Sequence, residues 1–97
     1  MYIAEQNALV FIIKELPKMN IPFEKIERDL HFITAKTLYN YIAGRTKPKC
    51  KKFSFLTQAL HERYPYEYEC AKAKFERENG KTLKELIAEE VAAYSTL

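Results

Sequence analysis

Apolar residues recur at helical spacing along most of the chain, and this spacing predicts a series of amphipathic helices. The first helix should keep one apolar face formed by Ile3, Leu9, Val10, Ile13 and Leu16. It should end at Pro17, which has no amide hydrogen to donate. We expect Asn20 to cap a second helix with Pro22 in its first turn. Three apolar residues of this second helix should turn inward: Phe23, Ile26 and Leu30.

A short third helix is expected from about Ala35 to Ala43. Thr34 has the side chain of an N-cap, and Gly44 can end the helix because glycine accepts the left-handed conformation without steric cost. Its inward residues should be Leu38, Tyr41 and Ile42, which share a core with Leu30 and Ile33. The opposite, outward face should then carry Ala35, Lys36, Tyr39 and Asn40.

The rest of the chain also has helical periodicity. A fourth helix over about 51–63 should bury Phe53, Leu56, Ala59 and Leu60. Pro65 should restart the chain into a fifth helix over about 66–79 that ends at Gly80. Thr82 followed by Glu85 fits a capping box at the start of a sixth helix. The apolar stripe of that helix is Leu83, Leu86, Ile87, Val91 and Tyr94. The sequence therefore predicts an all-α fold.

Composition agrees with a small helical protein. With 97 residues, 47% hydrophobic and 30% charged, the chain can bury one modest core and no large substrate cavity. The longest apolar run, Ala8 to Ile13, is too short to span a bilayer, and no charged leader precedes it. We expect a cytoplasmic protein with no membrane partner and no small-molecule substrate.

Charge is distributed unevenly along the chain. From Met1 to Leu60, ten Lys and Arg face five Asp and Glu, whereas from His61 to Leu97 six face eight. No acidic residue lies between Asp29 and Glu62. The basic residues of that interval are Lys36, Arg45, Lys47, Lys49, Lys51 and Lys52. A segment with charge of one sign attracts a polyanion.

Catalytic and metal chemistry find little support in the sequence. His31, Cys50, His61 and Cys70 are the residues most suited to bind zinc, but none has a partner two to four positions away. The two cysteines are expected to be reduced and to pack as small hydrophobic residues. No nucleophile motif or phosphate-binding glycine loop occurs. We expect neither an enzyme nor a bound cofactor or metal.

The segment ITAKTLYNYIAGRTKPK, from Ile33 to Lys49, resembles the recognition helix and following loop of the Cro and lambda-repressor-like helix-turn-helix family. In that family a small or hydroxyl residue caps the helix, and a Gly-Lys/Arg-x-x-Pro loop follows it. Here Leu30-His31-Phe32-Ile33-Thr34 forms a turn one residue longer than the family pattern and without its glycine. The resemblance covers roughly residues 3–64. It implies a helix-turn-helix DNA-binding domain over 1–64 and a C-terminal helical extension over 65–97.

The resemblance further implies a transcriptional regulator, such as a repressor, of a phage, plasmid or bacterial operon. Members of the family commonly bind two-fold sites on double-stranded DNA as dimers, so we expect a homodimer. The extension over residues 65–97 is a candidate dimerisation or partner-binding segment.

Residue types on the outward face of the third helix suit base recognition. Asn40 can form two hydrogen bonds with adenine, Lys36 can reach guanine, and Tyr39 can contact a thymine methyl group. The expected base contacts are Ala35, Lys36, Tyr39 and Asn40. The expected phosphate contacts are Thr34, Arg45, Lys47, Lys49, Lys51 and Lys52.

Two other interpretations remain open at this point. Basic residues often form only a solvated face, which applies most to Lys51 and Lys52. In a second function class, the same fold is a protein-binding module, such as an antirepressor, that uses its acidic C-terminal helices as the contact surface.

Overall fold

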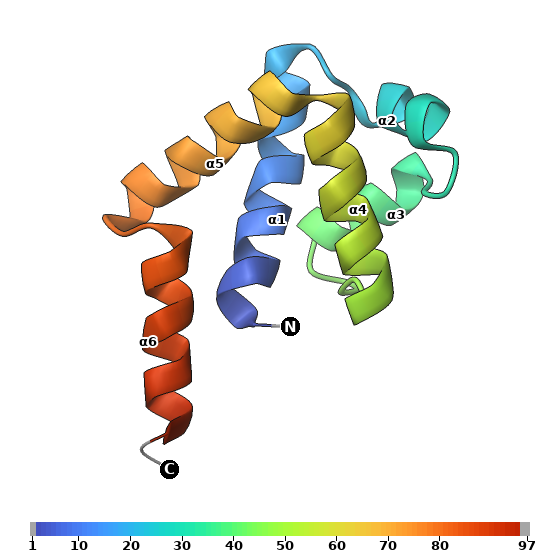
Figure 1. The fold of residues 1–97 in the computed structure, drawn as a ribbon. Helices are drawn as coiled ribbons and strands as arrows, with labels where there is room; N and C mark the ends of the chain where they lie inside the picture. The colour runs from blue at the N-terminus through green and yellow to red at the C-terminus, as the bar shows by residue number, and fades with distance from the viewer. Residues whose placement is uncertain (1, 96–97) are drawn as a thin grey trace.

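The computed structural model describes residues 2–95, which form α-helices, one 3₁₀ helix and no β-strand (Figure 1). In chain order these elements are α1 (Ile3–Glu15), the 3₁₀ helix η1 (Leu16–Met19), α2 (Phe23–Leu30), α3 (Ala35–Ile42), α4 (Cys50–Arg63), α5 (Pro65–Asn79) and α6 (Leu83–Ser95). The all-α class predicted from the sequence is confirmed.

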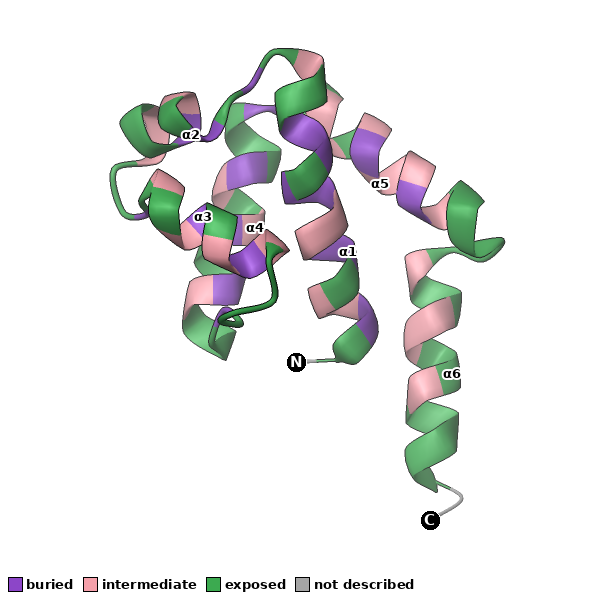
Figure 2. Ribbon diagram, turned by 180° about the vertical axis from the view of Figure 1, so that it is seen from behind, coloured by how far each residue is buried: buried purple, intermediate pink, exposed green. Residues whose placement is uncertain are grey.

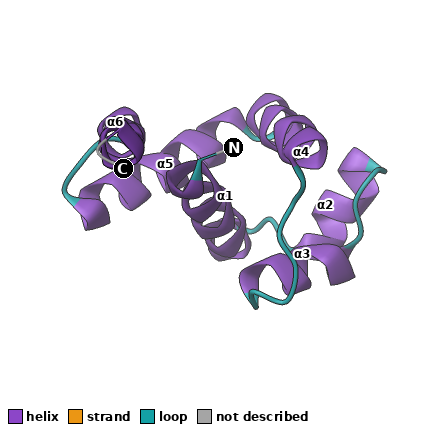
Figure 3. Cartoon of the chain, turned by 90° about the horizontal axis from the view of Figure 1, so that it is seen from below, coloured by secondary structure: helices purple, strands orange, loops and turns teal. Residues whose placement is uncertain are grey.

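Helix α1 occupies the middle of the molecule. Helices α2, α3 and α4 lie on one side of it, whereas α5 and α6 lie on the other (Figure 3). The chain extends over 44 × 25 × 22 Å, with α6 at the opposite end from α2 and α3. The face of α3 that carries the predicted contacts is therefore far from the C-terminal helix.

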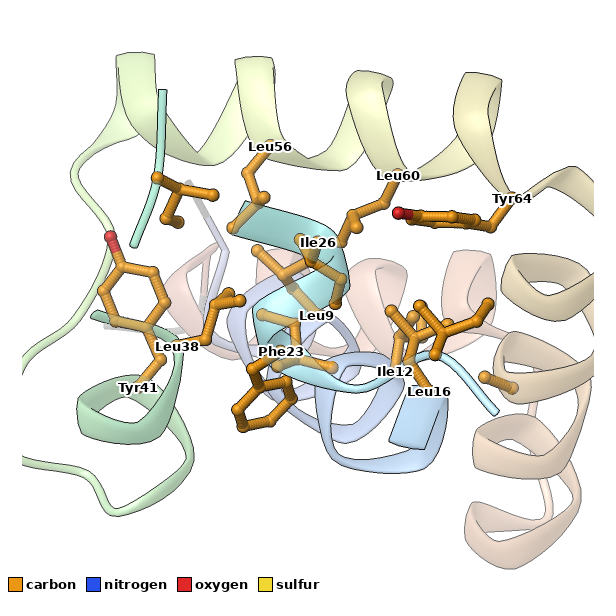
Figure 4. Close-up of a cluster of buried hydrophobic side chains, with 14 of the residues drawn as sticks. Leu9, Ile12, Leu16, Phe23, Ile26, Leu38, Tyr41, Leu56, Leu60 and Tyr64 are labelled. Atoms are coloured by element: carbon orange, nitrogen blue, oxygen red, sulfur yellow. The ribbon is translucent and has the colours of Figure 1, made fainter. Parts of the chain in front are cut away.

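The hydrophobic core joins α1 through α5. Side chains from the first four helices and from Tyr64 converge in Figure 4. The fully buried large residues are Leu9, Ile12, Ile13, Leu16, Ile26, Leu38, Leu56 and Leu60. Helix α5 adds Ala71 to the same core, while no residue described in α6 is buried (Figure 2). Residues 65–79 thus share the core of the preceding helices, and α6 packs on its outside.

Most predicted helix ends are confirmed. The Thr34 side chain accepts a hydrogen bond from the Thr37 amide at 3.1 Å and caps α3. Gly44 and Gly80 have φ angles of +74° and +68°, the left-handed conformation that glycine favours. Thr82 and Glu85 bond each other's amides at 3.1 Å, which forms the predicted capping box.

Some other details of the prediction were wrong. Asn20 does not cap α2; it ends η1 in the left-handed conformation with φ of 66°, and Pro22 precedes α2. Asparagine tolerates that conformation because its short polar side chain can bond locally. Ile3 is 57% exposed instead of turning inward, because it lies on the side of α1 that lines an open hollow with Val10 and Lys14. Cys50 is exposed at the start of α4 and does not pack as a hydrophobic residue.

Over residues 2–95, no helix combines the length and apolar character required to cross a lipid bilayer.

Candidate nucleic-acid interface

Four residues, 31–34, connect α2 to α3. His31 adopts the left-handed conformation with φ of 65°. The Phe32 amide then donates to the Leu30 carbonyl at 2.8 Å, and Ile33 is only 3% exposed. The longer turn is therefore closed by His31 and anchored in the core by Ile33.

The amino end of α3 is held by groups within the protein. The Thr34 hydroxyl bonds the Thr37 amide and lies 2.9 Å from the Thr37 hydroxyl. The Ala35 amide donates to Glu27 Oε1 of α2 at 2.9 Å. A carboxylate at this position interacts favourably with the helix dipole. A phosphate approaching Thr34 would compete with Glu27 for this end of the helix.

The exposed face of α3 carries three of the four predicted base contacts. Lys36 is exposed, Asn40 is half-buried, and Tyr39 is 49% exposed with its ring edge-on to Phe23 at 4.7 Å between centroids. Ala35 does not belong to this face, because it is half-buried and packs against the core. The predicted outward position of Ala35 was wrong, since it lies directly above buried Leu38 on the helix.

Asn40 and Arg45 form a pair at the carboxyl end of α3. Arg45 Nη1 donates to Asn40 Oδ1 at 3.2 Å. A guanidinium group has only donors, so the amide oxygen of Asn40 must face Arg45. The Asn40 Nδ2 group is consequently the end of the amide directed away from Arg45.

A hollow of about 350 Å³ lies between α3, the loop after it and the start of α4. Its lining residues are Thr37, Asn40, Tyr41, Thr46, Lys47, Lys49 and Lys52. Burial raises the pKa of the Tyr41 hydroxyl, which therefore stays protonated. The hollow, which we call the basic hollow, brings together lysines, hydroxyl groups and one amide. This combination suits a phosphate group.

Thr37 and Thr46 are residues of the basic hollow that the sequence did not single out. Their only sequence signal is a hydroxyl group within the acid-free interval, with Thr37 one helical turn before Asn40. Position in the helix alone could not reveal that the loop folds back beside Thr37.

Among the remaining basic residues, Lys52 is bonded within the protein, whereas the others are exposed. Lys52 Nζ donates to the Phe32 carbonyl at 3.0 Å and lies 5.6 Å from the Phe32 ring centroid. This contact ties the start of α4 to the turn before α3. Arg45, Lys47, Lys49 and Lys51 are exposed. Lys51 is not among the residues that line the basic hollow.

The part of the chain that the structure describes contains no group of three or more His, Cys, Asp or Glu able to hold a metal ion. His61 Nε2 instead lies 2.9 Å from Glu69 Oε1, and the His61 ring is tilted against that of Tyr68 with 4.9 Å between centroids. Cys50 and Cys70 are free thiols.

Comparison of the chain with protein-family models, with curated proteins and with solved structures found no match.

Proposed function

We propose that this protein is a sequence-specific double-stranded DNA-binding transcriptional regulator with a lambda-repressor-like helix-turn-helix formed by α2 and α3. One observation carries the proposal. The exposed face of α3 carries Lys36, Tyr39 and Asn40, and it borders the basic hollow. Asn40 belongs to both, because it also lines the hollow. Groups suited to base edges and groups suited to phosphates thus form one surface.

The dimensions of α3 support reading of the major groove. An α-helix with its side chains is about 10–12 Å across, and the major groove is about 12 Å wide, so the exposed side of α3 can enter it. In this arrangement Lys36, Tyr39 and Asn40 contact base edges. Arg45, Lys47 and Lys49 contact the phosphates beside the groove, which accounts for an interval from residue 30 to residue 61 that has no acid.

The proposed biological role is regulation of a phage, plasmid or bacterial operon as a homodimer on a two-fold site. A two-fold protein places two recognition helices about one turn of DNA apart, so its site is a palindrome with a fixed spacing. The sequence of that site should emerge from selection of bound fragments out of random duplexes.

Electrophoretic retardation of a random duplex pool at increasing salt tests DNA binding. We expect affinity to fall steeply with salt, and Lys36→Ala and Asn40→Ala to weaken retention, with Asn40→Ala also relaxing sequence preference. Lys84→Ala is the matched control for Lys36→Ala, because it removes one exposed lysine from α6, far from α3. If Lys84→Ala and Lys36→Ala have the same effect, or if no duplex is retained, the proposal fails.

A protein-binding role for the C-terminal helices is the second candidate. It is favoured by exposed apolar residues near the junction of α6 with α1, where Val91 is 41%, Tyr94 61% and Ile3 57% exposed. Under this alternative no variant of α3 would alter retention of DNA, and Val91→Ser would abolish binding of a protein partner.

A further inference from the structure

The outer face of α4 is formed by Lys51, Phe55, Gln58 and Glu62, which are all exposed. We infer that it pairs with the same face of a second copy of this chain, in an antiparallel arrangement about a two-fold axis. The inference concerns the partner and not the DNA, and it can be measured without DNA. It rests on the homodimer of the proposed function and assigns the interface of that dimer. A dimer that the α4 variants do not weaken would refute the interface and leave DNA binding intact.

Two aromatic side chains are exposed at this face. Phe55 is 56% exposed and Phe32, from the turn before α3, is 39% exposed. They line a hollow of about 550 Å³ together with Lys52, Gln58, Ala59 and Glu62. The aromatic pair lies in the same hollow as long polar side chains. An aromatic centre with a polar rim is the usual composition of a protein interface.

The spacing along α4 places the four residues of the outer face in one stripe. They are separated by four, three and four positions, which is the spacing of neighbours on one side of a helix. Phe53, Leu56 and Leu60 lie on the other side and are buried in the core. The stripe is therefore a continuous outer surface about three turns long.

The charges on the stripe favour a second copy over an unrelated partner. Lys51 lies at one end and Glu62 at the other. If two stripes run antiparallel about an axis level with the Leu56–Thr57 bond, Lys51 meets Glu62 of the second copy at both ends. In the same register Phe55 meets Gln58 of the second copy, twice. This one position of the axis thus pairs both charged residues of the stripe with opposite charges, which is the self-complementarity that a two-fold interface requires.

A parallel arrangement does not have this property. It would place Lys51 against Lys51 and Glu62 against Glu62, and juxtaposed like charges disfavour association. The charges thus select the antiparallel register, while the phenylalanine side chains supply the apolar contact.

In this dimer, Lys51 has a role other than the one expected from the sequence. Lys51, expected from the sequence to contact phosphate, instead pairs with Glu62 of the second copy. Lys52 remains at the basic hollow and bonds the Phe32 carbonyl. Lys51 therefore contacts the second copy while Lys52 faces the basic hollow, because successive helical residues point about 100° apart.

Sedimentation equilibrium of the full chain over a wide concentration range tests the inference. We expect a reversible dimer, and Phe55→Ser should weaken its association by at least about tenfold, as loss of an interface anchor does. Lys51→Glu and Glu62→Lys should each weaken it as well, because each places like charges opposite one another. Circular dichroism of each variant should remain that of the wild type, since all three residues are exposed.

Exchange of the two charges tests whether Lys51 of one copy contacts Glu62 of the other directly. When the Lys51→Glu and Glu62→Lys chains are mixed, every end pair is again opposite in sign, so the mixture should associate more tightly than either variant does alone. The double variant should also recover self-association. Val91→Ser, on the apolar part of α6, serves as the control and should leave the dimer unchanged.

Three results would overturn the inference. One is a monomer at every concentration. Another is a dimer that Phe55→Ser and the charge variants do not weaken, or that Val91→Ser dissociates. The third is a mixture of the charge variants that associates no more tightly than either variant does alone.

Discussion

The contact between Arg45 and Asn40 bears on which base the protein would select. Arg45 donates to the amide oxygen of Asn40 and so competes with adenine for the acceptor that adenine recognition requires. Under the proposed function, we expect the wild type to prefer guanine, whose O6 and N7 accept hydrogen bonds, opposite Asn40. Arg45→Ala should free the oxygen and shift the preference toward adenine by about 1 kcal/mol or more. Titration of duplexes that differ at that one base pair measures this preference.

Lys47→Ala is the appropriate control for Arg45→Ala. It removes one positive charge from the same loop, but Lys47 has no hydrogen bond to Asn40 in the contacts seen over residues 2–95. It should weaken binding to all duplexes uniformly and reduce the salt dependence. Equal base preferences in the Arg45→Ala, Lys47→Ala and wild-type proteins would refute this role of Arg45.

Glu15 is a buried carboxylate that makes stability depend on pH. It is 7% exposed and bonds Lys18 at 2.7 Å and Lys74 at 2.6 Å. These two ammonium groups hold the pKa of Glu15 below its usual value. Because the folded pKa is lower than the unfolded one, the stabilisation is present above the unfolded pKa and is lost as the pH falls through the folded pKa.

Glu15→Gln should therefore lower the free energy of unfolding at pH 7 by about 1–2 kcal/mol and flatten its decrease toward acidic pH. Urea denaturation between pH 7 and pH 3 measures both effects. Glu24→Gln, which changes an exposed carboxylate of α2, is the control. If the two variants have the same pH profile, Glu15 does not have the proposed effect.

At the scale of the helices, the sequence predicted the helix ends that are capped by residues close to them in the sequence. Thr34 caps α3 through an amide three residues away, and Thr82 and Glu85 bond each other across the same distance. Gly44 and Gly80 were predicted because only the local backbone conformation matters there. These features are encoded within a few residues and can be read without knowledge of the fold.

Other helix ends depend on residues distant in the sequence and were not predictable. The amides of Ile3 and Ala4, at the start of α1, donate to Glu90 of α6 at 2.8 and 2.9 Å. Glu27 similarly caps α3 from the preceding helix. Only the packing of one helix beside another brings these carboxylates to the amides. Thr37 was missed at the candidate site for the same reason, since the loop after α3 lies beside it.

The two left-handed residues that flank α3 provide a matched test of backbone strain. His31 and Gly44 have φ angles of 65° and 74°. A side chain in this conformation costs about 1 kcal/mol, so His31→Gly should raise the free energy of unfolding by about that amount. Gly44→Ala should lower it by a similar amount, although an added Cβ would meet no atom within 4 Å. Chemical denaturation of both variants checks the opposite signs.

An unchanged or lower stability in His31→Gly would show that the His31 side chain contributes contacts that outweigh its strained conformation. In that case Gly44→Ala would still test the strain alone, because Gly44 has no side chain to lose.

At the scale of the whole molecule, the sequence did not predict how α5 and α6 differ. Both belong to the expected extension over residues 65–97, and both have amphipathic patterns. Yet α5 supplies Ala71 and Phe75 to the buried interior, while α6 supplies no buried residue among those described. The difference arises because α5 crosses α1 beside the core, whereas α6 packs against the outer side of α1.

Truncation at two positions tests this difference. A chain that ends at Gly80 loses the Glu90 cap of α1 and the half-buried contacts of α6. We expect it to unfold cooperatively with a free energy of unfolding lower by about 2–4 kcal/mol, and to retain DNA as the full chain does under the proposed function.

A chain that ends at Tyr64 also loses Ala71, Phe75 and the Lys74 partner of Glu15. It should show no cooperative thermal transition, because one side of α1 is then open to water. Cooperative unfolding of the chain that ends at Tyr64 would instead establish residues 1–64 as an independent domain.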